Sequence, residues 1–157
     1  MENTEPFEVE RQVLDILCPH CKLSLRKQVV IELDFKRANN QEGVLRMSPD
    51  PGDYLDVFTS PQLGDKEVVT MLCPHCKQSL NVTKENDPNE IVEMVVKCED
   101  EVHEVHYISA RFNEHWTVRW DGQSYRQYGS PNPELMQLVE ARDKSKVLKK
   151  FAKVLVN

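Results

Sequence analysis

The sequence predicts an α+β fold that is mostly β: an antiparallel sheet with a long insertion, a β-meander and a C-terminal helix. β-branched and aromatic residues are frequent around two near-identical cysteine-containing turns, which indicates strands there. Asp121 and Gly122 stand between two strand-like segments, as in a tight β-hairpin. Only the C-terminal residues 133–157 carry apolar side chains at helical spacing.

In the first half, strands are expected on both sides of each cysteine turn. These segments are residues 7–17, 26–35, 66–72 and 79–83. Residues 36–64 carry repeated Pro and Gly, which favours a loop-rich insertion with a short extended piece at residues 53–60.

The second half predicts an antiparallel meander. Strands are expected at residues 91–98, 102–112, 115–120 and 124–128. Trp116, Val118 and Trp120 alternate along the third of these, so they share one face. The aromatic group that also includes Tyr125 and Tyr128 is expected either in the core or at a protein interface.

The helix begins after Asn132, a good N-cap residue, with Pro133 in its first turn. The apolar spacing weakens at residues 143–146, where a break is expected. The length of 157 residues suits one domain covering residues 1–157.

The stretch LCPHCKLSL at residues 17–25 returns as LCPHCKQSL at residues 72–80, and we call these the first and second knuckle. A C-x2-C turn holds two thiolates on one side of a metal ion, and two such turns complete a tetrahedral shell. The predicted ligands are Cys18, Cys21, Cys73 and Cys76, holding one structural Zn²⁺. Such a shell has no open position for water or substrate, so the sequence predicts a scaffold and not an enzyme.

The long spacing between the two knuckles predicts how the chain is organised. Residues 22–72 separate the two cysteine pairs, far more than the 15–20 or so residues of a short zinc ribbon. We therefore expect a zinc-ribbon-like part at residues 12–96, with the insertion at residues 36–64 inside it. Residues 97–157 would form β-hairpins and the C-terminal helix.

C-P-H-C is also the active-site tetrapeptide of disulfide oxidases, in which a helix N-terminus lowers the thiol pKa. Neither copy here is followed by an amphipathic helical pattern, but a CPHC thiol-disulfide oxidoreductase stays an alternative. His20 and His75 are expected to be exposed turn residues. Lys22 and Lys77 would offset the negative charge of the thiolates.

Charge and hydropathy limit the kinds of partner that are expected. The formal net charge of −6 argues against nucleic acid, although the five lysines within residues 144–153 keep a nucleic-acid-binding zinc ribbon as another alternative. The sequence shows no export signal and no apolar run of membrane-spanning length, so a cytoplasmic, membrane-free protein is expected. Thiols stay reduced in the cytoplasm, which favours metal ligation.

Cys98, His103 and His106 lie close together in the sequence, so a second metal site there stays open. Alternation along a strand would point the two histidines to opposite faces.

The two C-P-x-C knuckles, each preceded by a strand, and the segment SPQLGDKEVVTMLCPHC at residues 60–76 resemble the bacterial CpXC-motif domain family, a zinc-ribbon-like group. The resemblance covers residues 12–96 and implies a zinc-ribbon-like fold with a metal site. The family usually has glycine in place of Lys22 and Lys77, and its tyrosine-histidine-aspartate segment has no counterpart here. The layout also resembles the zinc-bearing gamma subunit of acetone carboxylases, which implies an accessory subunit.

We therefore expect a noncatalytic structural-zinc protein that acts as an accessory or protein-interaction subunit. Its partners would be other protein subunits. Residues 97–157 are the first candidate contact surface, and the insertion at residues 36–64 is the second.

Overall fold

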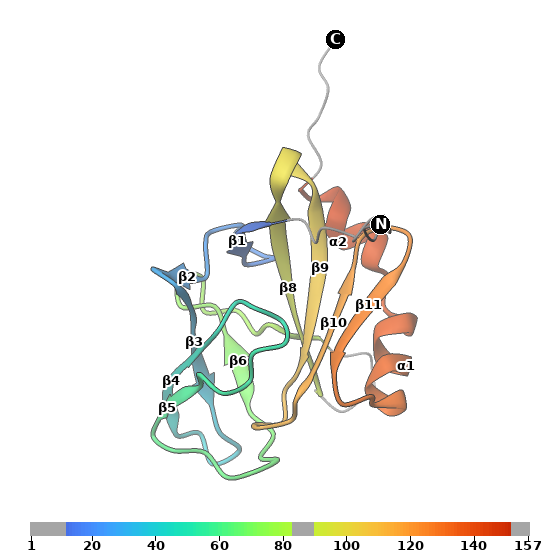
Figure 1. Cartoon of the computed structure of the whole chain (residues 1–157). Coiled ribbons are helices and arrows are strands. Elements are labelled where there is room, and N and C mark those ends of the chain that lie inside the picture. Colours follow the sequence, from blue (N-terminus) through green and yellow to red (C-terminus); the bar gives the residue numbers. More distant parts are fainter. Residues whose placement is uncertain (1–11, 83–89, 152–157) are drawn as a thin grey trace, which may run out of the picture.

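Two antiparallel sheets and two helices make up the described part of the chain, residues 12–82 and 90–151 of a computed structural model (Figure 1). In the larger sheet the strands follow the order β1 (Val13–Leu17), β8 (Ile91–Cys98), β9 (His103–Ser109), β10 (Trp116–Trp120) and β11 (Tyr125–Gly129), and β7 (Asn81–Val82) also pairs with β8. In the smaller sheet the order is β2 (Arg26–Lys27), β3 (Val30–Lys36), β4 (Glu42–Met47) and β5 (Phe58–Ser60), and β6 (Thr70–Leu72) also pairs with β3. The predicted fold class, α+β and mostly β, is confirmed.

The meander of the second half follows the prediction. β8 covers the expected residues, and β10 pairs with β11 across the Asp121 and Gly122 turn, with Trp120 opposite Tyr125. A 3-10 turn, η1 (Glu99–Glu101), joins β8 to β9.

The first half differs from the prediction in several places. The strand expected at residues 66–72 covers only Thr70–Leu72, and the extended piece expected at residues 53–60 is a strand only over Phe58–Ser60. The expected strand at residues 26–35 is divided by a turn, where Gln28 has a φ of 60°, so that β2 folds back on β3. The insertion is more regular than expected, because β4 pairs with β3 from Glu42 to Met47. Leu45 is buried by this pairing, which the short, charged segment did not reveal by itself. Residues 7–11 and 83–89 lie outside the described residues.

The two knuckles exchange strands. β1 enters the first knuckle and β2 and β3 leave it, while β6 enters the second and β7 and β8 leave it. The entering strand of each repeat pairs with the long leaving strand of the other, β6 with β3 and β1 with β8. The two pairings have the same register. Leu72, the last residue of β6, lies opposite Asp34, and Leu17, the last residue of β1, lies opposite Val95. The repeats are therefore interlocked, which brings distant cysteines together.

Two apolar clusters produce three layers, with the larger sheet in the middle (Figure 1). The inter-sheet core contains Phe35, Leu45 and Met94. The helix-side core lies under α1 (Pro133–Ala141) and α2 (Lys144–Lys149). Its buried residues are Ile91, Val95, Val105, Tyr107, Trp116, Val118, Leu135, Val139 and Val147. Of the aromatic group, Trp116 is therefore a core residue, and Trp120 and Tyr125 are partly buried against this core.

Side-chain caps fix both helices. Asn132 Oδ1 accepts a hydrogen bond from the Leu135 amide at the start of α1, as predicted. A break is present but lies earlier than the expected residues 143–146: α1 ends before Arg142, and residues 144–146 already belong to α2. Asp143 caps α2 by accepting from the Lys146 amide. No helix in the described ranges is long and apolar enough to cross a membrane.

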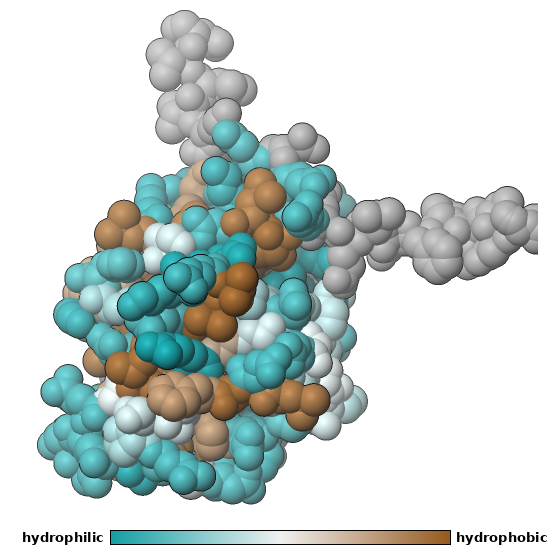
Figure 2. Space-filling view, turned by 60° about the vertical axis from the view of Figure 1, so that its left-hand side comes forward, coloured by the Kyte–Doolittle hydropathy of each residue, from teal (hydrophilic) through white to brown (hydrophobic). Residues whose placement is uncertain are grey.

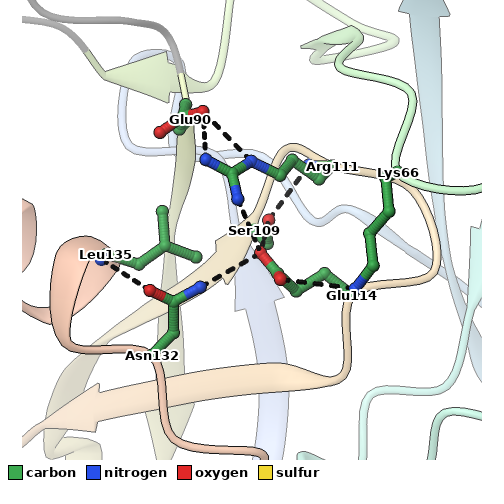
Figure 3. Close-up of polar contacts among 7 residues, drawn as sticks. All are labelled: Lys66, Glu90, Ser109, Arg111, Glu114, Asn132 and Leu135. Carbon is green, nitrogen blue, oxygen red and sulfur yellow. Dashed lines mark hydrogen bonds and ion pairs between the residues drawn. The ribbon is translucent and has the colours of Figure 1, made fainter.

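Glu114, in the loop between β9 and β10, ties α1 to the sheets (Figure 3). Its carboxylate accepts hydrogen bonds from Ser109 Oγ at 3.0 Å, Asn132 Nδ2 at 3.4 Å and Lys66 Nζ at 3.4 Å. Arg111 Nη1 lies 3.8 Å from the same carboxylate. One side chain thus joins the N-cap of α1, the end of β9 and the segment before β6.

Candidate metal centre

The four predicted ligands meet at one point between the knuckles. Their Sγ atoms all lie within 4.8 Å of one another, and all four are free thiols. The Sγ atoms of Cys18 and Cys76 are 3.8 Å apart, and those of Cys21 and Cys73 are 3.7 Å apart. A tetrahedron with metal–sulfur bonds of about 2.3 Å has edges of about 3.8 Å. The cluster can therefore hold a metal ion.

The backbone of each knuckle forms the same turn. In the first, Cys18 N donates to Leu23 O at 2.9 Å and Lys22 N donates to Cys18 O at 2.9 Å. The His20 amide points at Cys18 Sγ at 3.3 Å. In the second knuckle the corresponding three distances are 3.0, 2.9 and 3.4 Å. Amides directed at sulfur favour the thiolate form that binds metal.

Lys22 and Lys77 close these turns in the left-handed region, with φ values of 66° and 63°. A residue with a Cβ is disfavoured there by about 1–2 kcal/mol. This explains why glycine would suit the position, as in the resembling family. Lys77 Nζ pairs with the Asp34 carboxylate at 2.8 Å, which is the largest cause of its raised pKa, and the nearby Cys73 thiol raises this pKa further. Lys22 Nζ lies 5.5 Å from the ring centroid of Phe151.

His20 and His75 link the two knuckles. Their rings are exposed, as predicted, but each ring reaches the opposite repeat. His20 Nε2 donates to Ser79 O at 3.0 Å, and His75 Nε2 donates to Ser24 O at 2.9 Å. Since the acceptors are carbonyls, the proton lies on Nε2 of each ring. The sequence signal that could have revealed this pair is the identical position of histidine in both copies.

Burial controls the protonation of the thiols. Cys18 and Cys73 are fully buried, and Cys21 and Cys76 are half-buried. Burial raises the pKa of Cys18 to about 12 and also raises the pKa of Cys73. For Cys76, burial raises the pKa, but the Gln78 amide and the neighbouring thiols outweigh it and lower the pKa overall. Metal binding must therefore displace protons from the buried pair.

Cys98, His103 and His106 do not form a ligand group with one another among the described residues. His106 is buried and accepts a hydrogen bond from Arg119 Nε at 3.1 Å. The ring centroid of His103 lies 5.4 Å from that of Phe151. The two histidines cannot bind one ion together because side chains alternate along β9, which places His103 and His106 on different faces of the sheet.

Two features bear on the alternative functions. Each C-P-H-C turn leads into a short strand, β2 or β7, and not into a helix N-terminus of the kind that activates oxidoreductase thiols. In the lysine-rich segment, Lys144 is buried and its Nζ donates to Val139 O and Arg142 O. This lysine is therefore not available to a phosphate backbone.

Comparisons with known proteins identify no family. No family model matches the chain, and no curated protein or solved structure shows significant similarity to it. The resemblance to the CpXC-motif domains stays a prediction from the knuckle motifs.

Proposed function

We propose that this chain is a noncatalytic structural-zinc protein that serves as an accessory or interaction subunit of a larger protein complex in the cytoplasm. The observation that carries the proposal is the cluster of four thiols shared by two interlocked repeats, with all sulfurs within 4.8 Å of one another and two pairs at 3.7 and 3.8 Å. Four cysteine ligands suit Zn²⁺ and complete its coordination shell. A shell filled by protein leaves no position for a reacting water.

The metal would act as a clamp between the repeats. Each pair of sulfurs near 3.8 Å joins a cysteine of one knuckle to a cysteine of the other, Cys18 to Cys76 and Cys21 to Cys73. Structural zinc contributes about 10–16 kcal/mol in small zinc domains. That energy would favour the arrangement in which β1 and β6 pair with strands of the opposite repeats. The metal therefore stabilises the fold that presents other surfaces.

We place the partner surface in the insertion and no longer in residues 97–157. Many apolar side chains of the aromatic hairpin and of α1 lie in the helix-side core, which leaves less apolar surface there for a partner. The segment at residues 53–60 exposes Leu55, Val57 and Phe58, and Leu55 is 90 % exposed. Exposed apolar side chains in a long connection are typical of protein-binding segments. Figure 2 shows the side of the molecule that carries the smaller sheet, where apolar areas alternate with polar ones.

The exposed segment is held in place by the larger sheet. Tyr54 Oη forms a 2.8 Å hydrogen bond with Thr117 Oγ1, and its ring stacks on His115 with the centroids 4.7 Å apart. An anchored segment loses less conformational entropy on binding than a free loop does. Leu55 and Phe58 are therefore presented on a supported segment.

Elemental analysis of the purified protein tests the metal. About one zinc per chain is expected, and Cys73→Ser should lose the metal and unfold both repeats. Cys98→Ala is the matched control, because Cys98 is buried outside the four-thiol cluster, so this variant should keep its zinc. Iron in place of zinc, or a metal-free protein that stays folded, would contradict the zinc assignment.

Affinity capture from the native host tests the partner surface. The Leu55→Ser/Phe58→Ser variant should keep its zinc and its unfolding temperature but lose a protein that wild type captures. Val29→Ser is the control, since Val29 is a highly exposed apolar residue in the β2–β3 turn. A lone monomer without a copurifying partner would end the accessory-subunit proposal, and turnover in an insulin-reduction assay would favour the oxidoreductase instead.

A further inference from the structure

A cavity of about 420 Å³ is lined by four segments that are distant in the sequence: the start of β1, Arg26 in β2, residues 49–51 of the insertion, and Arg119 in β10. It is separate from the four-thiol cluster and plays no part in the proposed function. Two arginines, Arg26 and Arg119, line it. Asp50 also lines it, but this residue is exposed, so water screens its charge more than that of a buried group.

Arg119 is a buried cation held by neutral groups. The residue is 3 % exposed, its Nε donates to His106 Nδ1 at 3.1 Å, and its Nη2 donates to Pro49 O at 3.2 Å. Burial, together with the charge of Arg119, keeps the pKa of His106 well below its usual range, so this imidazole is neutral. Within residues 12–82 and 90–151, no carboxylate forms an ion pair with Arg119.

A buried charge without an opposite charge is unfavourable unless something else compensates it. Burial lowers the pKa of Arg119 overall, although the nearby Tyr128 and Glu104 raise it in part, and the Glu104 carboxylate is itself paired with Arg126. An anion in the adjoining cavity would supply the compensation. The hydrogen bond to His106 would orient the guanidinium without neutralising it.

Arg26 supplies a second set of donors. Its Nη1 donates to Leu14 O at 3.2 Å, while its Nε is buried and has no hydrogen-bond partner among the described residues. A guanidinium presents a planar fork of N–H groups that matches the oxygens of a carboxylate or phosphate. Buried N–H groups without partners are rare in folded proteins, so this one points to a ligand or an ordered water.

We propose that this cavity binds a small oxyanion, with a phosphate or carboxylate group held between Arg119 and Arg26. The pocket is large enough for a small metabolite attached to that group. Its walls come from the insertion, the first repeat and the meander, so the bound anion would join all three.

Isothermal titration of the zinc-loaded, full-length protein tests the site with two probes, inorganic phosphate and malonate, at an ionic strength held constant with sodium chloride. Saturable binding of at least one probe is expected, and the tighter probe identifies the chemical class of the oxyanion. Arg26→Gln should weaken binding by about tenfold or more, the effect of removing one charged hydrogen-bonding group. Arg46→Gln is the control, because Arg46 pairs with Glu32 on the smaller sheet and does not line the cavity.

A second readout avoids any variant that fails to fold. In wild-type protein, phosphate or malonate should shift the Arg119 Nε–H resonance in NMR spectra, with the same midpoint as the calorimetric titration. The proposal is overturned if neither probe binds beyond chloride, if Arg26→Gln binds as tightly as wild type, or if the Arg119 resonance does not move on saturation.

Discussion

Substitution of His20 and His75 tests whether their hydrogen bonds stabilise the contact between the two knuckles. His20 and His75 donate to carbonyls of the opposite repeat, at 3.0 and 2.9 Å. In the His20→Ala/His75→Ala variant both bonds are lost, while the four thiols and the turns around them stay in place. The variant therefore separates the histidine bridge from the metal ligands.

The size of the effect follows from the geometry. Each bond is short but lies at an exposed site, so water can replace the donor to Ser79 O or Ser24 O. A typical hydrogen bond contributes about 0.5–1.5 kcal/mol net, and exposure favours the lower part of that range. The double variant should lose about 1–2 kcal/mol in free energy of unfolding. The two losses should be roughly additive, since each ring has its own acceptor.

Urea denaturation of the zinc-loaded protein measures the loss, and the rate of zinc transfer to a chelator measures how readily the knuckles separate. Transfer should be faster in the double variant. His20→Gln/His75→Gln is the matched control, because a glutamine Nε2 can donate to the same carbonyl and should restore part of the stability. If the alanine variant matches wild type in both stability and transfer rate, the bridges do not hold the knuckles.

Two further predictions concern buried polar groups of the larger sheet, Glu93 in β8 and His106 in β9. Glu93→Gln should lower the free energy of unfolding by about 3 kcal/mol, because it breaks a buried ion pair. The Glu93 carboxylate accepts hydrogen bonds from Arg142 Nε and Nη2 at 2.9 and 3.0 Å and from Tyr107 Oη at 2.7 Å. A loss under about 1 kcal/mol in urea denaturation would contradict a strong buried pair. Because the pKa of His106 is lowered in the folded state, stability should be constant above about pH 6.5 and fall as the pH drops below it, by up to about 1.4 kcal/mol per pH unit. His106→Asn, which keeps an acceptor for Arg119, should flatten that fall when unfolding is compared at pH 7 and 5.5, and an unchanged slope would show that another group controls it.

The clustering of the four cysteines could be predicted because the same C-x2-C pattern occurs twice in the sequence. Two stretches with cysteines at the same positions are typical of a shared metal site, and in the structure the sulfurs of these four residues lie together, those of Cys18, Cys21, Cys73 and Cys76. Hairpin and helix boundaries followed from local chemistry in the same way, as with the Asp121 and Gly122 turn and the Asn132 cap. The metal identity and the partner stay predictions.

What the sequence by itself determined was local: the two knuckles, the β10–β11 hairpin, the Asn132 cap of α1 and a fold that is mostly β. Tertiary structure alone decided which strands pair across the repeats, that Glu42–Met47 forms β4, and that Arg26 and Arg119 line one cavity. The physical reason is that turn and cap preferences act within a few residues, whereas strand pairing and buried charge depend on segments far apart in the chain. The periodicity of a strand shows which side chains share a face, but not which strand will lie beside it.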